Sequence, residues 1–216
     1  MRSQSLELII LFGVIPIVLL IMRVSGIRIS PLPVLWIAAV ACLILMQRAK
    51  KGSTDAAMAN AARRIKPSRS NTIELILVIV ICSGLLLIVY PLITTSPMFQ
   101  FPRERPFLWV VVLCLYPILS VIPQGIVFRR WFVLRYTSVL GVSGMMIVIG
   151  ALCFGFSHIL FGNVVAPVIT AIGGALFMRT YLKSGSAWLA DLEHAVLGNV
   201  AFTIGYGQWL YSGATG

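Results

Sequence analysis

Two short segments hold most of the ionisable side chains that could do chemistry. Asp191, Glu193 and His194 occupy three of four consecutive positions inside an apolar stretch, and His158 follows the aromatic run Phe154-Gly155-Phe156-Ser157. The chain has only six acidic residues and two histidines, so acid–base or metal chemistry must draw on this small set. Ionisable residues inside apolar helices usually face a cavity or a partner. These residues are therefore the first candidates for a functional site.

Helical spacing sorts these candidates by direction. Asp191 and His194 are three residues apart, so they share one helix face, and Gly198 extends that face. Glu193 points elsewhere, toward another helix or a cavity. A structural polar network between helices is the alternative interpretation of this cluster, and a hydrogen-bonded core histidine is the alternative for His158.

A third polar group lies at the end of another apolar stretch, where Gln124 is followed by Arg129 and Arg130. Arginines at such an end often extend toward the membrane interface, which is the alternative to a role in a site. Together with His158 and His194, residues from three helices could converge. Such a site could deprotonate water and hold an oxyanion, or bind a metal through two neutral imidazoles and a carboxylate.

The elements that position these residues are expected to be membrane helices. Hydrophobic residues make up 59% of the 216 residues, charged residues make up 11%, and the mean hydropathy is +0.99. A soluble domain carries about 25% charged residues, so the composition excludes a disordered protein and argues against a soluble domain. Because a span takes roughly 20 apolar residues, we predict an all-α, polytopic transmembrane helical bundle of about seven spans.

The apolar segments place these spans along the chain. They run over Leu6–Met22, Leu32–Met46, Thr72–Ile93, Phe107–Phe128, Val139–Phe161, Val164–Leu182 and Ala187–Ile204. The second segment is short enough to be tilted or partly re-entrant. We divide this single membrane domain into N-terminal helices (1–106) and a C-terminal core (107–207). The N-terminal part contains a basic loop at 47–70, whose middle, Thr54–Ala62, could form a short surface helix.

Basic residues outnumber acidic ones by 17 to 6, which gives a formal charge of +11. In a soluble protein this excess would suggest nucleic acid. Here the basic residues lie between apolar segments, so we expect no nucleic-acid partner and instead contact with the lipid bilayer and a topology signal. A cytoplasmic N-terminus puts 13 basic residues, including those of a turn at Arg129–Thr137, in the cytoplasm and four outside. We therefore predict an integral membrane protein with a cytoplasmic N-terminus.

Three motifs carry a resemblance to a known family. The chain reads Gln124-Gly125 followed by Phe128-Arg129, then Phe154 with His158, then His194 with Gly198-Asn199. In order and spacing these resemble Glu-Glu-x-x-x-Arg, Phe-x-x-x-His and His-x-x-x-Asn/Asp of the CAAX-protease and bacteriocin-processing (CPBP) intramembrane peptidases, which include the prenyl-protein endopeptidases. Pro123-Gln124 and Leu192-Glu193-His194-Ala195 also resemble a bacterial subgroup that has Pro-Gln-Glu in the first motif. This subgroup implies the bacterial inner (cytoplasmic) membrane as the location.

The resemblance also implies a substrate and residue roles. The substrate would be a membrane-embedded peptide or protein, cleaved by water activated at a buried Glu/His site. His158 would act as a base or a metal ligand, and His194 with Asn199 would hold the oxyanion. The two histidines could also bind a divalent metal such as zinc. The predicted catalytic set is Gln124, Arg129, His158, Glu193, His194 and Asn199, and Phe154 and Trp131 are the predicted substrate contacts.

Departures from the motifs leave several functions open. The family's glutamate pair, which is taken to activate water, is Gln124-Gly125 here, and neither residue can act as a base. The third-motif Asn199 is displaced by one residue. One hypothesis is an active endopeptidase in which Glu193 or Asp191 replaces the missing glutamate. Another is a degenerate pseudoprotease that acts as a membrane scaffold or binding protein. A two-histidine haem or metal protein is a third, and a Gly125 that replaces a natural glutamate is a fourth.

Overall fold

The computed structural model describes residues 2–27, 30–50 and 69–210, and every regular element in this part of the chain is a helix. The prediction of an all-α fold is therefore confirmed. Within the described ranges, six helical stretches are long and apolar enough to cross a membrane. They are Gln4–Val24, Pro31–Arg48, Thr72–Ile93, Pro106–Leu140, Gly144–Phe161 and Val165–Ser184. A seventh long helix, Ala187–Ile204, has the bounds that the sequence predicts and is less apolar because it carries the acidic residues and His194.

The helices are named here in chain order. The N-terminal helices are α1 (Arg2–Ile9), η1 (Ile10–Val14), α2 (Ile15–Val24), α3 (Pro31–Lys50), α5 (Arg69–Ile93) and α6 (Gln100–Glu104). One long helix follows as α7 (Pro106–Tyr116), η2 (Pro117–Val121), α8 (Ile122–Gly125), η3 (Ile126–Trp131) and α9 (Phe132–Leu140). The last helices are α10 (Gly144–Ser157), η4 (His158–Phe161), α11 (Val165–Ser184), α12 (Ala187–Ile204) and α13 (Gly207–Leu210). The predicted surface helix at Thr54–Ala62 lies outside the described residues.

The predicted end of the fourth span is wrong. The helix that begins at Pro106 runs through η3 and α9 to Leu140, so the predicted turn at Arg129–Thr137 is helical. The apolar pattern stops at the arginines, but their charges have partners on neighbouring helices. Arg135, for example, pairs with Glu7 of α1. Three of the thirteen basic residues assigned to the cytoplasm therefore lie within this helix. The remaining ten still outnumber the four assigned to the outside, so the predicted orientation is unchanged.

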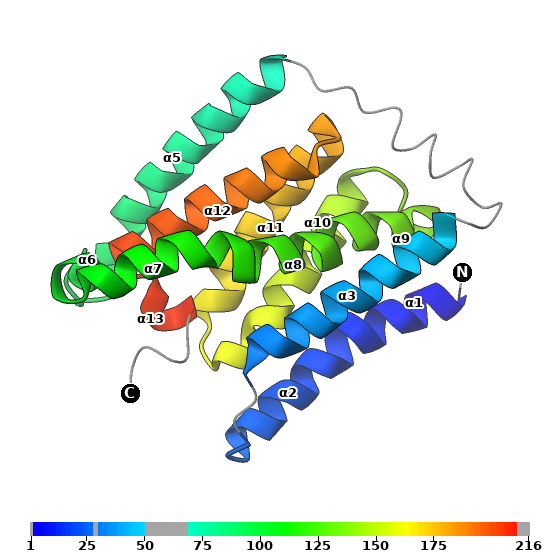
Figure 1. Ribbon diagram of the computed structural model, residues 1–216, viewed down its shortest axis with the longest axis horizontal. Helices are drawn as coiled ribbons and strands as arrows, with labels where there is room; N and C mark the ends of the chain where they lie inside the picture. The colour runs from blue at the N-terminus through cyan, green and yellow to red at the C-terminus, as the bar shows by residue number, and fades with distance from the viewer. Residues whose placement is uncertain (1, 28–29, 51–68, 211–216) are drawn as a thin grey trace.

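Helix α12 occupies the centre of the arrangement. Figure 1 shows it running between α5 on one side and the α7–α8 helix on the other, and it also packs on α11. Two hydrogen bonds fasten it to α7: Trp109 Nε1 donates to Thr203 Oγ1 (3.0 Å), and Asn199 Nδ2 donates to the Leu113 carbonyl (3.1 Å). Polar cross-links of this kind stabilise helix association where the surroundings are apolar.

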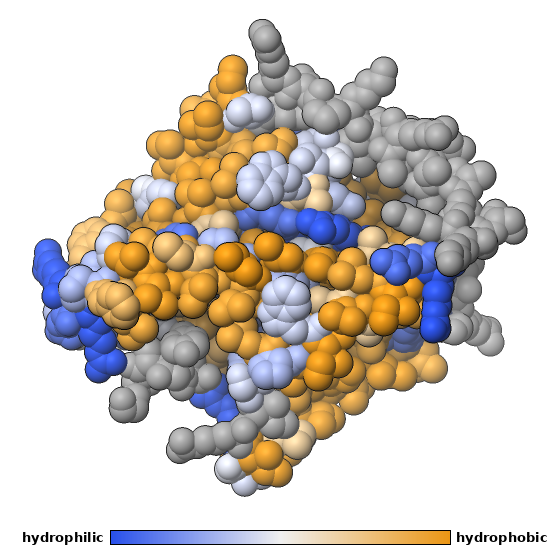
Figure 2. Space-filling model, in the orientation of Figure 1, coloured by the Kyte–Doolittle hydropathy of each residue, from blue (hydrophilic) through white to orange (hydrophobic). Residues whose placement is uncertain are grey.

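An aromatic cluster joins the N-terminal helices to the long helix. Phe12 of η1 is buried against Phe132, with ring centroids 5.4 Å apart, and against Trp131 and Tyr136. Figure 1 shows α1, α2 and α3 along this edge of the molecule. The outside of the molecule is largely apolar, as lipid contact requires, and Figure 2 shows one hydrophilic strip in the middle of the face where α8 and α12 run side by side.

Helices α10 and α11 pack closely against each other, and Gly155 permits this approach. A Cβ at Gly155 would lie 2.6 Å from the Ala171 Cβ and 2.7 Å from the Pro167 carbonyl oxygen. The second of these atoms belongs to the backbone and cannot swing away. Small residues at such crossings let membrane helices pack closely.

We therefore predict that Gly155→Ala destabilises the detergent-solubilised protein. Overpacking of this kind costs about 1–3 kcal/mol, and the measurement is the thermal unfolding midpoint. Gly84→Ala in α5 is the matched control, since no atom lies within 4 Å of a Cβ built there. That control should leave the midpoint unchanged or raise it, because alanine favours helix. Equal midpoints for the two variants would contradict the packing role of Gly155.

Candidate functional site

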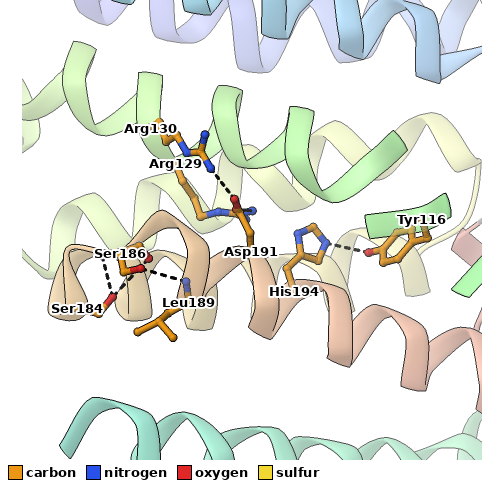
Figure 3. Close-up of polar contacts among 8 residues, drawn as sticks. All are labelled: Tyr116, Arg129, Arg130, Ser184, Ser186, Leu189, Asp191 and His194. Atoms are coloured by element: carbon orange, nitrogen blue, oxygen red, sulfur yellow. Dashed lines mark hydrogen bonds and ion pairs between the residues drawn. The ribbon is translucent and has the colours of Figure 1, made fainter. Parts of the chain in front are cut away.

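A buried group of three charged residues joins the long helix to α12. Arg129 Nη2 donates to Asp191 Oδ1 and Arg130 Nη2 donates to Asp191 Oδ2, each at 2.7 Å (Figure 3). The Arg129 side chain is only 3% exposed, whereas that of Arg130 is 31% exposed. The interpretation of Arg129 as an interfacial residue is therefore wrong, because its charge finds a carboxylate inside the bundle. We call these three residues the ion triad.

Gly125 makes room for the ion triad. A Cβ at this position would lie 2.7 Å from Arg129 Nη2 and closer still to Asp191 Oδ1. Any side chain at 125 would have to displace the Asp191 carboxylate or the Arg129 head group. Asp191 thus fills space next to the position where the first motif of the CPBP peptidases has a glutamate.

His194 directly follows Glu193 on α12, and it is only 4% exposed. Its Nε2 atom is 2.9 Å from the Tyr116 hydroxyl (Figure 3). The imidazole stacks on Phe177, with centroids 4.4 Å apart and planes at 20°, and the Arg129 guanidinium lies 5.7 Å from the centroid of the same Phe177 ring. These contacts bring the ion triad and His194 into one cluster.

His158 joins this cluster through Phe154. It lies where α10 passes into η4, and its Nδ1 donates to the Phe154 carbonyl at 2.7 Å, one of the carbonyls left free at a helix end. The Phe154 ring contacts both imidazoles, with centroid distances of 4.8 Å to His158 and 5.6 Å to His194. The structure therefore brings the two histidines, Arg129 and Phe154 together, as the motifs predict.

Sequence reasoning missed Tyr116, which lies in an uninterrupted apolar stretch with no motif of its own. One signal could have pointed to it. Gly198 sits on the helix face of His194, and a Cβ there would overlap the Tyr116 ring and hydroxyl. A glycine one turn from His194 therefore marks the approach of a bulky side chain from another helix.

Glu193 faces away from the histidines. It is fully buried, and neither carboxylate oxygen has a hydrogen-bond partner among the described residues. Its polar neighbours are Thr180 of α11 and Cys82 of α5. The prediction that Asp191 and Glu193 point in different directions is confirmed, since Asp191 pairs across the opposite interface.

The remaining predicted residues lie at the edges of the cluster or outside it. Gln124 Nε2 donates to Ser120 Oγ (3.2 Å), and the Gln124 Oε1 is buried without a partner in the described chain. Asn199 is tied to α7, and its Oδ1 is likewise unpartnered there. Trp131 is not brought to the histidines, because it is buried in the aromatic cluster with Phe12. The predicted roles of these three residues stay predictions.

A metal site is not completed by these side chains. Within the described ranges, no three His, Cys, Asp or Glu residues lie together in a way that could hold a metal ion. His158 and His194 each have one ring nitrogen in a hydrogen bond, and both Asp191 oxygens accept from arginines. This donor set does not fit zinc with three protein ligands. The two-histidine metal or haem hypotheses stay predictions without a third ligand to support them.

Part of the chain matches a known protein family. Residues 106–199 match the family model of type II CAAX prenyl endopeptidases, Rce1-like. The matched segment runs from the start of α7 into α12, so this CAAX-peptidase-like segment contains both histidines and the ion triad. The match confirms the family resemblance and, with the six apolar helical stretches, shows an integral membrane protein. No curated protein and no solved structure matches the chain.

The ion triad yields a stability prediction for the CAAX-peptidase-like segment. Asp191→Asn leaves two guanidiniums without a counter-charge, one of them buried, and breaking a buried pair in this way costs about 3–5 kcal/mol. We expect a large fall in the unfolding midpoint in detergent.

Glu74→Gln is the matched control for that experiment. Glu74 also pairs with two cations, Arg179 and Lys183, but all three side chains are substantially exposed. Exposed ion pairs contribute little to stability. A fall for Glu74→Gln as large as that for Asp191→Asn would show that burial of the ion triad is not what matters.

Proposed function

We propose that this protein binds a membrane-embedded peptide or protein segment at the histidine cluster without hydrolysing it, as a degenerate relative of the CAAX peptidases. One observation carries the proposal. The carboxylate beside the first-motif position, Asp191, has each of its oxygens occupied by an arginine N–H. A carboxylate held in this way serves as a counter-ion, because a proton taken from water would leave both guanidiniums without their counter-charge.

The other candidate bases add to this conclusion. Gln124 carries an amide and Gly125 carries no side chain, so the first motif supplies no proton acceptor of the required kind. Family resemblance implies that a glutamate works together with the second-motif histidine. His158 is present, but the carboxylate partner beside it is missing.

The features that support binding are retained. Phe154 and Phe177 provide apolar ring surface around two imidazoles, and ligand sites commonly combine such surface with a few polar groups. His194 Nδ1 is buried without a partner in the described part of the chain, so one polar atom of the cluster remains available. A membrane-embedded segment that carries polar backbone groups would suit this combination.

A second candidate function, hydrolysis by a relocated carboxylate, is favoured by Glu193. A fully buried carboxylate that pairs with no basic side chain in the described part of the chain is costly inside a membrane protein and suggests function. For catalysis, Glu193 would have to turn from Thr180 toward the histidines. If the natural chain cleaves peptides and Glu193→Gln abolishes that cleavage, the result would establish this alternative and overturn the proposed non-hydrolytic function.

The decisive experiment restores a glutamate. Because Asp191 occupies the space beside position 125, Gly125→Glu alone should clash with the ion triad and stay inactive. The double variant Gly125→Glu/Asp191→Ala frees that space and gives Arg129 a new partner. We predict peptide cleavage by the double variant only, measured by mass spectrometry with a library of membrane-inserted peptides in proteoliposomes.

Two controls define the result. Adding His158→Ala to the double variant should remove the gained activity, since the introduced glutamate would then lack its imidazole partner. Asp191→Ala alone should be inactive. Cleavage by the unmodified protein would refute the proposed non-hydrolytic function.

The location belongs to the same proposal. We propose that the protein lies in a bacterial inner membrane with its N-terminus in the cytoplasm, which the basic bias of ten against four supports. Alkaline phosphatase inserted after Ser96, between α5 and α6, should then be active, whereas insertion after Gly141 should give an inactive reporter. The reverse activities would show the opposite orientation.

A further inference from the structure

We propose that Tyr116 sets the tautomer of His194, so that the two histidines present one hydrogen-bond donor and one acceptor to a single backbone amide of an unwound peptide. This inference rests on the proposed binding function and gives it a chemical class of ligand. Tyr116 is a positioning residue in it, because it acts through His194.

The proton on His158 is fixed by its partner. A backbone carbonyl can only accept a hydrogen bond, so the Nδ1 atom that lies 2.7 Å from the Phe154 carbonyl must carry a proton. A neutral imidazole carries one proton, which leaves Nε2 as a bare acceptor. No hydrogen bond to Nε2 is found among the described residues. His158 therefore offers an acceptor.

The proton on His194 follows from the chemistry of Tyr116. A phenol hydroxyl is a stronger donor than a neutral imidazole N–H, and an imidazole nitrogen is a stronger acceptor than a phenol oxygen. In the 2.9 Å contact, Tyr116 therefore donates to Nε2, and the ring proton of His194 is on Nδ1. His194 thus offers a donor.

The donor on His194 has nothing to bond in the described chain. Its Nδ1 is buried without a partner, and an unpaired buried donor is costly. Turning the ring does not remove the problem, because a 180° flip would break the contact of Nε2 with Tyr116 and a smaller rotation would lose the stacking on Phe177. The cost is relieved when a ligand oxygen accepts from Nδ1.

A glycine in α12 makes room for Tyr116. A Cβ at Gly198 would overlap the tyrosine ring and hydroxyl, so the glycine lets the hydroxyl reach Nε2. The ring also meets Phe202 edge-on, with centroids 5.1 Å apart. The tyrosine is therefore held between two residues of α12 in line with His194.

One donor and one acceptor around the same Phe154 ring match a secondary amide. Its C=O would accept from His194 Nδ1–H, and its N–H would donate to His158 Nε2. The backbone of a regular membrane helix has these groups already paired within the helix. The ligand is therefore an unwound stretch of peptide rather than an intact helical span.

The first test reads the tautomers without any variant. Histidine ¹⁵N spectra of the detergent-solubilised protein at neutral pH should show the proton on Nδ1 for both His158 and His194. Free histidine prefers the proton on Nε2, so this pattern reports imposed tautomers. Tyr116→Phe should move the His194 proton to Nε2 and leave His158 unchanged. Tyr136→Phe, which removes a buried hydroxyl in the aromatic cluster, is the matched control and should change neither.

The second test uses N-acetyl-leucine N-methylamide as the probe. Titration should shift the ¹⁵N signals of both histidines, and Tyr116→Phe should weaken the binding about tenfold, as expected for one hydrogen bond. The N,N-dimethylamide, which lacks the N–H, should bind more weakly and leave His158 unaffected. A His194 proton found on Nε2 in the natural protein overturns the role of Tyr116. The expected tautomers without probe binding would keep that role and refute the amide site, whereas the proposed function stands or falls with the cleavage experiments on the natural chain and the double variant.

Discussion

The need to neutralise the buried Arg129 governs the centre of this molecule. A guanidinium that is nearly inaccessible inside an apolar bundle requires a counter-charge at hydrogen-bonding distance. Asp191 supplies it from α12 and at the same time accepts from Arg130. This arrangement fixes the position of α12 along the axis of the long helix, because the Asp191 carboxylate must contact both arginines. The contacts of Tyr116 with His194 and of Leu113 with Asn199 then fall along the same interface.

The same requirement decides the chemistry of the site. An aspartate that accepts from two arginines is their counter-charge, so it cannot take up a proton from water and also keep both arginines neutralised. The histidines are not under this constraint, since each has one ring nitrogen in a hydrogen bond with a neutral group and the other nitrogen has no hydrogen-bond partner among the described residues. The cluster therefore combines two neutral hydrogen-bonding groups with a carboxylate that is paired with two arginines.

Periodicity and spacing were sufficient for much of this structure. The bounds of α12 and the shared face of Asp191, His194 and Gly198 could be predicted, because apolar periodicity and helix geometry are local properties. The end of the fourth span could not be predicted. Charged residues interrupt an apolar pattern in the sequence even where Asp191 and Glu7 neutralise them in the folded protein. Tyr116 was missed for the same reason: its role comes from a residue 78 positions away.

Gly125 links stability to function in a single position. Its backbone is in ordinary helical conformation, with φ −62° and ψ −35°, so the glycine is not needed for conformational freedom. What matters is the missing Cβ, whose space Asp191 and Arg129 occupy. Because residue 125 has no side chain, it cannot supply a base. For the same reason the Asp191 carboxylate can occupy the space beside it and serve as the counter-ion of Arg129. Regaining a carboxylate at 125 would displace the ion triad before it could activate water. A glutamate at 125 would have to displace the Asp191 carboxylate or the Arg129 head group, which is why the proposed test changes positions 125 and 191 together.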